Sequence, residues 1–193
     1  MMIDTELADT AQRELLDIAR QSLCAAVNGE NTRAFSAAQL LPALLGPACV
    51  FVTLSSGGRL RGCVGNLEPE PLAESVAWAA RQAALFDPRF PAVYPGELTD
   101  IHLEISVLSP HQPLPVTSRK ELMAALRPGR DGLLLTEGAS RATFLPKVWE
   151  QLPEPALFVD QLLLKAGLPV DYWSPNLRWS RYGAQTFGMG SGL

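Results

Sequence analysis

Apolar residues recur along the chain with two different periods, and each period predicts one kind of element. Residues 5–28 and residues 71–87 carry apolar side chains three and four positions apart, which predicts two amphipathic helices. Residues 101–108 instead alternate strictly between apolar and polar side chains, which predicts a strand with one buried face. The first half of the chain is therefore expected to combine helices with at least one half-buried strand.

A β-hairpin is predicted just before the second helix. The run 50–54 is β-branched and aromatic, the cluster 55–58 ends in two glycines, and 59–65 returns to strand-like sequence. Glycine tolerates the positive φ angles that a tight hairpin turn requires. At least one pair of strands is then antiparallel. We expect an α/β domain with a mixed sheet and flanking helices.

The second half of the chain is expected to hold shorter elements and a smaller lobe. Proline-rich residues 110–120 are typical of a connector. The remaining predicted elements are helices at 121–126, 147–152 and 155–166 and strands at 132–136 and 178–187. The expected organisation is one domain over 1–187, with a larger lobe (1–109 and 153–187), a smaller lobe (110–152) and a flexible tail at 188–193.

Composition narrows the setting without identifying a reaction. The net charge of −4 and the pI near 5.2 argue against a nucleic-acid binder, which normally shows a basic face. No apolar run approaches the ~20 residues that span a bilayer, and the first residues lack the pattern of a signal peptide. The three cysteines are odd in number, which favours a reducing cytoplasm. The cysteines and the two histidines complete no zinc-ligand spacing, so no metal is expected.

Candidate chemistry lies on the returning strand of the hairpin. Arg61 and Cys63 are two residues apart on a strand and should project from the same face, where a guanidinium would favour the nucleophilic thiolate. Gly62 and Gly65 would let a ligand or another chain approach the backbone. The alternative is structural, with Cys63 packed beneath the helix at 71–87 and Arg61 paired with a carboxylate.

Two neighbouring segments could complete a site. Glu104 lies between His102 and Ser106 on the polar face of the 101–108 strand, and Arg61 is its expected partner. A solvent-exposed sheet face would give the same alternation without any function. Asp87, Arg89 and Phe90 follow the second helix and could close one side of a pocket. An ion pair that caps the helix and fixes the loop is equally compatible with the sequence.

Residues 60–65, Leu-Arg-Gly-Cys-Val-Gly, closely resemble the LRGCIG hallmark of the AMMECR domain family. Further segments resemble the same family in the same order, from the first helix to about Phe187: residues 87–91, 104–109, 142–146 and 165–168. Lys147 departs from the family's usual glutamine. The resemblance implies an α/β fold of two unequal subdomains with a cleft, and the hallmark at or near that cleft.

The resemblance also implies roles and partners. Its motifs nominate eight site residues: Arg61, Gly62, Cys63, Gly65, Asp87, Arg89, Phe90 and Glu104. If the chain is an enzyme, Cys63 and Glu104 are the expected catalytic residues, and the other six are expected to bind the ligand. Prokaryotic members are also called AmmeMemoRadiSam system protein A, which implies an association with Memo-like and radical SAM proteins. It assigns no cofactor to this chain, and three cysteines cannot supply a four-cysteine cluster site. Two functions remain open, a cytosolic small-molecule enzyme or ligand-binding protein and a non-catalytic partner subunit.

Overall fold

The computed structural model describes residues 6–30 and 35–190. The chain divides into two compact units. The first unit ends at Ser109 and takes up the chain again from Gln185, and the second comprises Pro110–Ala184. Each unit has its own hydrophobic core, so each is described separately.

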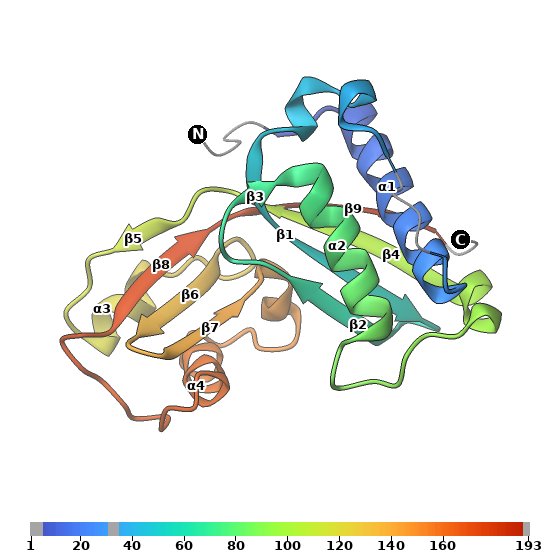
Figure 1. Ribbon diagram of the computed structural model, residues 1–193. Helices are drawn as coiled ribbons and strands as arrows, with labels where there is room; N and C mark the ends of the chain where they lie inside the picture. Colours follow the sequence, from blue (N-terminus) through green and yellow to red (C-terminus); the bar gives the residue numbers. More distant parts are fainter. Residues whose placement is uncertain (1–5, 31–34, 191–193) are drawn as a thin grey trace. The chain divides into compact units, whose positions relative to one another are not determined.

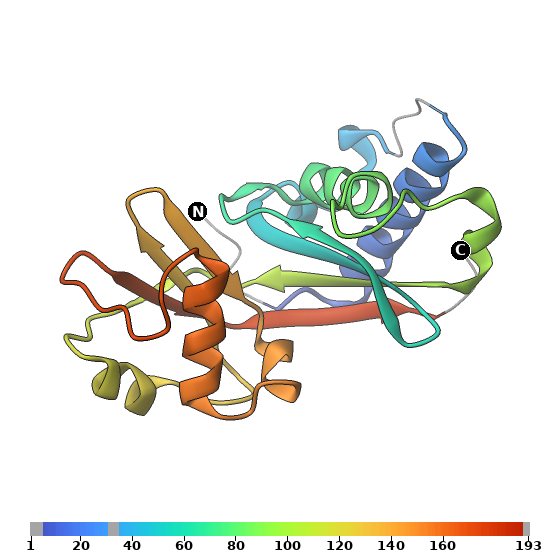
Figure 2. The same ribbon diagram turned by 90° about the horizontal axis from the view of Figure 1, so that it is seen from below.

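The first unit is built on a sheet with the strand order β2-β1-β4-β9 (Figure 1). Its strands are β1 (Pro47–Ser56), β2 (Arg59–Gly65), β4 (Ile101–Leu108) and β9 (Ala184–Met189), and the short β3 (Glu70–Pro71) pairs with the start of β1. Strand β1 is antiparallel to both β2 and β4. Because the order begins with β2, that strand forms one edge of the sheet, while β4 and β9 run side by side further across it (Figure 2).

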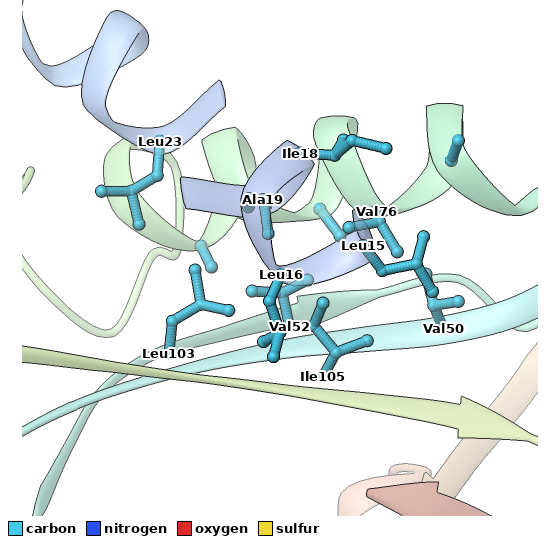
Figure 3. Close-up of a cluster of buried hydrophobic side chains, with 14 of the residues drawn as sticks. Leu15, Leu16, Ile18, Ala19, Leu23, Val50, Val52, Val76, Leu103 and Ile105 are labelled. Carbon is cyan, nitrogen blue, oxygen red and sulfur yellow. The ribbon is translucent and has the colours of Figure 1, made fainter. Parts of the chain in front are cut away.

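Two helices cover one face of this sheet. They are α1 (Asp9–Val27) and α2 (Leu72–Leu85), and they enclose a core with the strands (Figure 3). Val52 of β1 and Ile105 of β4 point into this core, and both are fully buried. Since side chains alternate along a strand, Thr53 and Glu104 lie on the opposite face, away from the two helices.

The hairpin turn and the irregular segments complete the first unit. Gly57 and Gly58 join β1 to β2 with φ angles of 56° and 74°, as a two-residue hairpin turn of this kind requires. The short 3₁₀ segments are η1 (Ala37–Gln39), η2 (Pro42–Leu44) and η3 (Pro95–Asp100). A loop over 86–94 connects α2 to η3, and this loop carries the candidate residues that follow the helix.

The second unit has a sheet with the strand order β5-β8-β6-β7. Its elements are β5 (Gln112–Leu114), α3 (Arg119–Ala125), β6 (Gly132–Glu137), β7 (Ser140–Phe144), the 3₁₀ segment η4 (Pro146–Glu150), α4 (Pro155–Lys165) and β8 (Arg178–Tyr182). In its core the Trp149 and Phe158 rings stack with centroids 3.8 Å apart.

The sequence predicts the α/β class and the first unit well. The two amphipathic helices, the hairpin and the 101–108 strand are all present, although α1 begins at Asp9 and residue 5 lies outside the described residues. The strand registers described in both sheets are antiparallel, and helices flank the sheets.

The second half differs from expectation in several elements. The single strand expected at 178–187 is two strands, β8 and β9, which belong to different sheets. Strand β7 and the short β5 were not expected, and the segment after Leu145 is a 3₁₀ helix. The expected tail begins too early, because β9 extends through Met189.

The lobe boundary at 152 also differs, because the second unit continues to Ala184. Helix α4 buries Phe158, Val159, Leu162 and Leu163 in the second core, together with Trp149. A helix that contributes this much apolar surface to one core belongs with that core. The expected boundary after residue 109 coincides with the division that the structure shows.

Candidate functional site

The backbone of Cys63 is fixed by two side chains from the loop after α2. The Cys63 N–H donates a hydrogen bond of 2.8 Å to Asp87 Oδ2, and the Cys63 carbonyl accepts one of 3.1 Å from Arg89 Nη2. Because β2 is an edge strand, these backbone groups would otherwise be open to water or to another chain. Asp87 and Arg89 therefore pair with the sheet edge in place of a further strand. We call this pair the edge clip.

The edge clip is itself tightly hydrogen bonded. Arg89 Nε and Nη2 donate to the two carboxylate oxygens of Asp87 at 2.9 and 2.7 Å, and the Arg89 N–H donates to Oδ1 at 3.1 Å. The Asp87 side chain is only 3% exposed, whereas that of Arg89 is 53% exposed. The hydrogen bond from Arg89, assisted by that from the Cys63 N–H, lowers the pKa of Asp87 to about 2. Asp87 is thus a charged, buried anchor.

Arg61 on β2 holds a later part of the same loop in place. Its Nε and Nη2 donate to the two carboxylate oxygens of Glu97 at 2.7 and 2.9 Å, and Nη1 donates to the Pro91 carbonyl at 2.8 Å. The hydrogen bond to Glu97 raises the pKa of Arg61, and the same contact lowers the pKa of Glu97. The expectation that Arg61 pairs with Glu104 is therefore wrong. The carboxylate that binds Arg61 comes from η3, near the end of the loop.

The Cys63 side chain lies on the face of the sheet away from α1 and α2, and the residue as a whole is partly exposed. Thr53 Oγ1 on β1 donates a hydrogen bond of 3.4 Å to Cys63 Sγ. The guanidinium whose charge acts on Cys63 is that of Arg89. The pKa of Arg89 is raised first by its hydrogen bond to Asp87 and further by Cys63. The sequence suggested a guanidinium beside the thiol, but the structure assigns that place to Arg89 instead of Arg61.

Glu104 belongs to the same row of residues across the sheet. Thr53 lies opposite Cys63 on one side and opposite Glu104 on the other. Glu104 is partly buried, and β1 separates it from β2. His102 is exposed and lies opposite Ser55, one step further along β1 on the same face. The structure therefore brings Cys63, Thr53 and Glu104 together in one row and leaves His102 outside it.

The two motif glycines have packing roles. A Cβ on Gly62 would lie 2.2 Å from the Ala83 carbonyl oxygen of α2, and one on Gly65 would lie 2.1 Å from the Val50 carbonyl oxygen. Both contacts are far shorter than real side chains tolerate, so each glycine lets two backbones approach closely. Gly62 is buried and faces the helix, so its expected place in a ligand contact is not supported by its surroundings.

Phe90 supports the edge clip from the side. The Arg89 guanidinium carbon lies 5.5 Å from the centroid of the Phe90 ring, a distance typical of a cation–π contact. The ring is half-buried. Phe90 therefore orients Arg89 and leaves one side of the guanidinium accessible.

Two residues of this site were not found by sequence reasoning. Thr53 is one of several polar residues on the hairpin, and its importance depends on its register with Cys63 and Glu104. Glu97 follows a run of prolines, and a sequence pattern does not show how far that loop folds back. Glu97 also accepts a hydrogen bond of 3.2 Å from the Tyr94 N–H, a local contact that the spacing of three residues could have suggested.

Metal-binding clusters and membrane-spanning helices are both absent from the part of the chain that the structure describes. Within residues 6–30 and 35–190, no three or more His, Cys, Asp or Glu side chains are grouped so that they could hold a metal ion. None of the helices in those same ranges is both long and apolar enough to cross a membrane.

Comparisons with known proteins agree with the hallmark and the fold. A sequence model of the AMMECR1 family matches residues 16–187. A protein from Methanothermobacter thermautotrophicus is 45% identical over 143 residues, covering 72% of this chain and 73% of its own length. Protein MK0488 from Methanopyrus kandleri is 40% identical over 148 residues, covering 72% and 70%.

The fold is also similar to a solved structure. The crystal structure of the uncharacterised protein PH0010 from Pyrococcus horikoshii matches with a TM-score of 0.89 and 28% identity, over 96% of this chain and 95% of that one. The family match spans both units and includes every site residue described above. The chain belongs to the AMMECR1 family.

Proposed function

We propose that this chain is a cytoplasmic small-molecule enzyme or ligand-binding protein whose reactive group is the Cys63 thiol. Cys63 would act as nucleophile or covalent carrier, and Arg89 would stabilise the thiolate. Glu104 would accept the proton that the thiol loses. Arg61, Asp87 and Phe90 would hold the loop and the edge strand in place, so they support the site without touching the ligand.

The observation that carries this proposal is the surroundings of the Cys63 sulfur. The residue is partly exposed, and its sulfur accepts a hydrogen bond from Thr53 and lies within the electrostatic reach of the Arg89 guanidinium. Reactive cysteines are found in partly exposed, electropositive surroundings of this kind, whereas structural cysteines are buried and inert. Cys49, which is fully buried, is an example of the second kind in the same chain.

The rigidity of the backbone around Cys63 supports the same conclusion. Both backbone groups of Cys63 are bound by the edge clip, and Gly62 is packed against α2. A side chain that reacts must be held within a fraction of an ångström of its productive position. The hydrogen bond that Cys63 donates to Asp87 and the one it accepts from Arg89 would provide this for Cys63, although they require the carboxylate of Asp87 to be buried.

The local charges favour a ligand that is neutral or weakly anionic. Arg89 is paired with Asp87, and Arg61 is paired with Glu97, so neither arginine contributes a full uncompensated charge. The outward side of Arg89 can still donate hydrogen bonds, because only Nε and Nη2 are engaged by Asp87 and the Cys63 carbonyl. A polar oxygen of a small electrophile could bind there beside the sulfur.

The test is alkylation of the native protein with iodoacetamide between about pH 6 and about pH 10, followed by peptide mapping. We expect Cys63 to react in the folded protein, and we expect Cys63→Ser to abolish that modification while Cys24 stays unchanged. Modification of Cys63 only after denaturation would remove the basis for a thiol-dependent function.

A second candidate function is docking onto a partner, which the family name suggests would be a Memo-like or radical SAM protein. The observation in its favour is the exposure of two aromatic side chains on the same loop, Phe86 at 64% and Tyr94 at 62%. Exposed aromatic residues are enriched where proteins bind one another. Co-purification with such partners tests this, and a Phe86→Ala, Tyr94→Ala double variant that still forms the complex would count against this surface.

A further inference from the structure

We propose that Thr53 relays the Cys63 proton to Glu104. The inference rests on the proposed function of Cys63 and extends it to the route by which the thiolate forms. Three residues on three adjacent strands make the route, Cys63 on β2, Thr53 on β1 and Glu104 on β4. The three residues are far apart in the sequence, and the register of the strands brings them together.

The backbone hydrogen bonds show that Thr53 is placed close to Cys63. Both backbone groups of Cys63 point outward to Asp87 and Arg89, so they are not available to β1. Thr53 and Cys63 therefore form a non-hydrogen-bonded pair, the kind in which opposing Cα atoms are only about 4.5 Å apart. The hydrogen bond of 3.4 Å from Thr53 Oγ1 to Cys63 Sγ agrees with this pairing.

The same pattern places Thr53 beside Glu104. The backbone groups of Thr53 must point away from β2 and towards β4, which makes Thr53 and Glu104 a hydrogen-bonded pair with Cα atoms about 5.5 Å apart. Directly opposed side chains on one face interact at such separations. Val52 and Ile105, the neighbours of these two residues along β1 and β4, point into the core, so Thr53 and Glu104 both lie on the other face.

The proton transfer can be written so that atoms and charge balance. The Cys63 S–H bond breaks, its proton passes to Thr53 Oγ1, and the hydroxyl proton of Thr53 passes to a carboxylate oxygen of Glu104. The sulfur keeps the electron pair and becomes a thiolate, and the Thr53 hydroxyl, which keeps the proton it received, donates a hydrogen bond to that sulfur. This final arrangement matches the direction of the hydrogen bond in the structure, from Thr53 to Cys63.

Electrostatics favours this route over loss of the proton to solvent. Transfer to Glu104 moves a negative charge from one end of the row to the other and leaves the total unchanged. Release of the proton to water would leave two negative charges in the row, two strands apart, and like charges repel. The half-exposed Arg89 guanidinium then stabilises the thiolate end of the row.

Two variants at Thr53 test the relay. Thr53→Val removes the hydroxyl at nearly constant shape, and Thr53→Ser keeps it. The measurement is the rate of Cys63 alkylation by iodoacetamide at about pH 7 and at about pH 9.5, on either side of the ordinary thiol pKa of about 8.5. We expect Thr53→Val and Glu104→Gln each to slow the reaction about tenfold at the lower pH, with rates converging at the higher pH where hydroxide removes the proton. Ser55→Val, on the same face of β1, is the matched control and should change neither rate.

The double variant separates a shared route from two independent effects. Because Glu104 acts through Thr53, Glu104→Gln should slow Cys63 alkylation by less than about a further twofold when Thr53→Val is already present. A Thr53→Val rate equal to that of the unmodified chain at pH 7, or an equal loss at both pH values, would overturn the relay. If Thr53→Val does not fold, Thr53→Ala also lacks the hydroxyl, and Glu104→Gln in the Thr53→Ala background gives the same decision.

Failure of the relay is distinguishable from failure of the proposed function. If Cys63 of the unmodified chain does not react in the folded state, the thiol function itself is wrong. If it reacts but is indifferent to Thr53 and Glu104, the thiol function stands and only the relay is wrong.

Discussion

Cys24 on α1 and Cys63 on β2 are both partly exposed thiols with an arginine nearby, yet their surroundings differ in kind. At Cys24, burial raises the pKa of the thiol, and the Arg20 guanidinium one helical turn earlier only opposes that effect. At Cys63, a hydroxyl donates to the sulfur and an arginine is fixed beside it by a buried carboxylate.

A guanidinium near a thiol is therefore not enough to make that thiol reactive. The Arg20 side chain is partly exposed on α1, and its ion pair with Asp17 is a long 3.8 Å. Arg89 is held by two short hydrogen bonds to Asp87, so its position is defined. A defined cation loses little entropy when a thiolate forms, whereas a mobile one must first be ordered.

The largest expected effect comes from the backbone that carries Cys63. Gly62→Ala places a Cβ 2.2 Å from the Ala83 carbonyl oxygen, so either β2 or α2 must move. We expect the free energy of unfolding of the first unit to fall by about 3 kcal/mol, at the upper end of the range for overpacking. Denaturant unfolding provides the measurement, and Gly190→Ala, where nothing lies within 4 Å, is the matched control. Equal stability of the two variants would show that the close approach is not needed.

Loss of the edge clip should come next. Asp87→Asn keeps the shape of the side chain but removes the charge that Arg89 and the Cys63 N–H both bind. We expect a loss of about 2 kcal/mol, because the charge-assisted hydrogen bonds that the buried Asp87 carboxylate accepts from Arg89 and the Cys63 N–H are weakened. Hydrogen exchange at the Cys63 amide should accelerate, while amides in the core of α1 should not change beyond the global loss. An unchanged Cys63 amide would contradict the clip.

The pKa of Asp87 also makes stability depend on pH in a defined window. Its folded value of about 2 lies below the ordinary value, so the ionised form stabilises the fold above about pH 4. That contribution, about 2 kcal/mol, should disappear as the pH falls from about 4 to about 2. Unfolding measured across this range should show the loss in the unmodified chain and a shallower slope in Asp87→Asn. Parallel slopes would mean that Asp87 is not the group responsible.

Neutralising each arginine sharpens the comparison between the two thiols directly. Arg89→Gln should slow Cys63 alkylation at neutral pH about tenfold, equivalent to about 1.4 kcal/mol. Arg20→Gln should change Cys24 alkylation by less than about twofold, because Arg20 is held only by its 3.8 Å ion pair with Asp17 and only opposes the effect of burial on the thiol. Mass mapping of both cysteines in each variant gives both rates. Equal sensitivity of the two thiols would erase the distinction drawn between them.

The smallest effect is expected at Glu97. Glu97→Gln weakens the contact that holds Arg61, but both side chains are partly exposed and the hydrogen bonds to the Pro91 and Ala92 carbonyls remain. We expect a loss of about 0.5–1 kcal/mol and less than a twofold change in Cys63 alkylation. A tenfold change would show that Arg61, and not Arg89, controls the thiol.

The sequence predicted most of the first unit because its signals are local. The helical spacing of α1 and α2, the two glycines of the hairpin turn and the alternation of β4 all act within a few residues. Strand β7 was not predicted because Ser140, Arg141 and Ala142 have little strand preference. Its conformation depends on pairing with β6. The division of 178–187 into β8 and β9 depends on which sheet each half joins, and no local pattern carries that information.

For the site, the sequence supplied the residues but not their pairings. It indicated Arg61, Cys63, Asp87, Arg89 and Glu104, and the alternative of an Asp–Arg pair that fixes the loop is the one found in the structure. It paired Arg61 with Glu104, because Glu97 lies in a proline-rich loop whose path depends on tertiary contacts. Thr53 could not be singled out either, since its relation to Cys63 and Glu104 exists only across three strands.

The most direct test of the central claim is a competition between Cys63 and Cys24 within one folded molecule. The protein is treated with less than one equivalent of iodoacetamide at neutral pH, and the modified peptides are quantified. We expect Cys63 to take at least about ten times as much label as Cys24, since Asp87 fixes a cation near Cys63 whereas burial raises the pKa of the Cys24 thiol. Equal labelling, or preferential labelling of Cys24, would contradict a reactive site at Cys63.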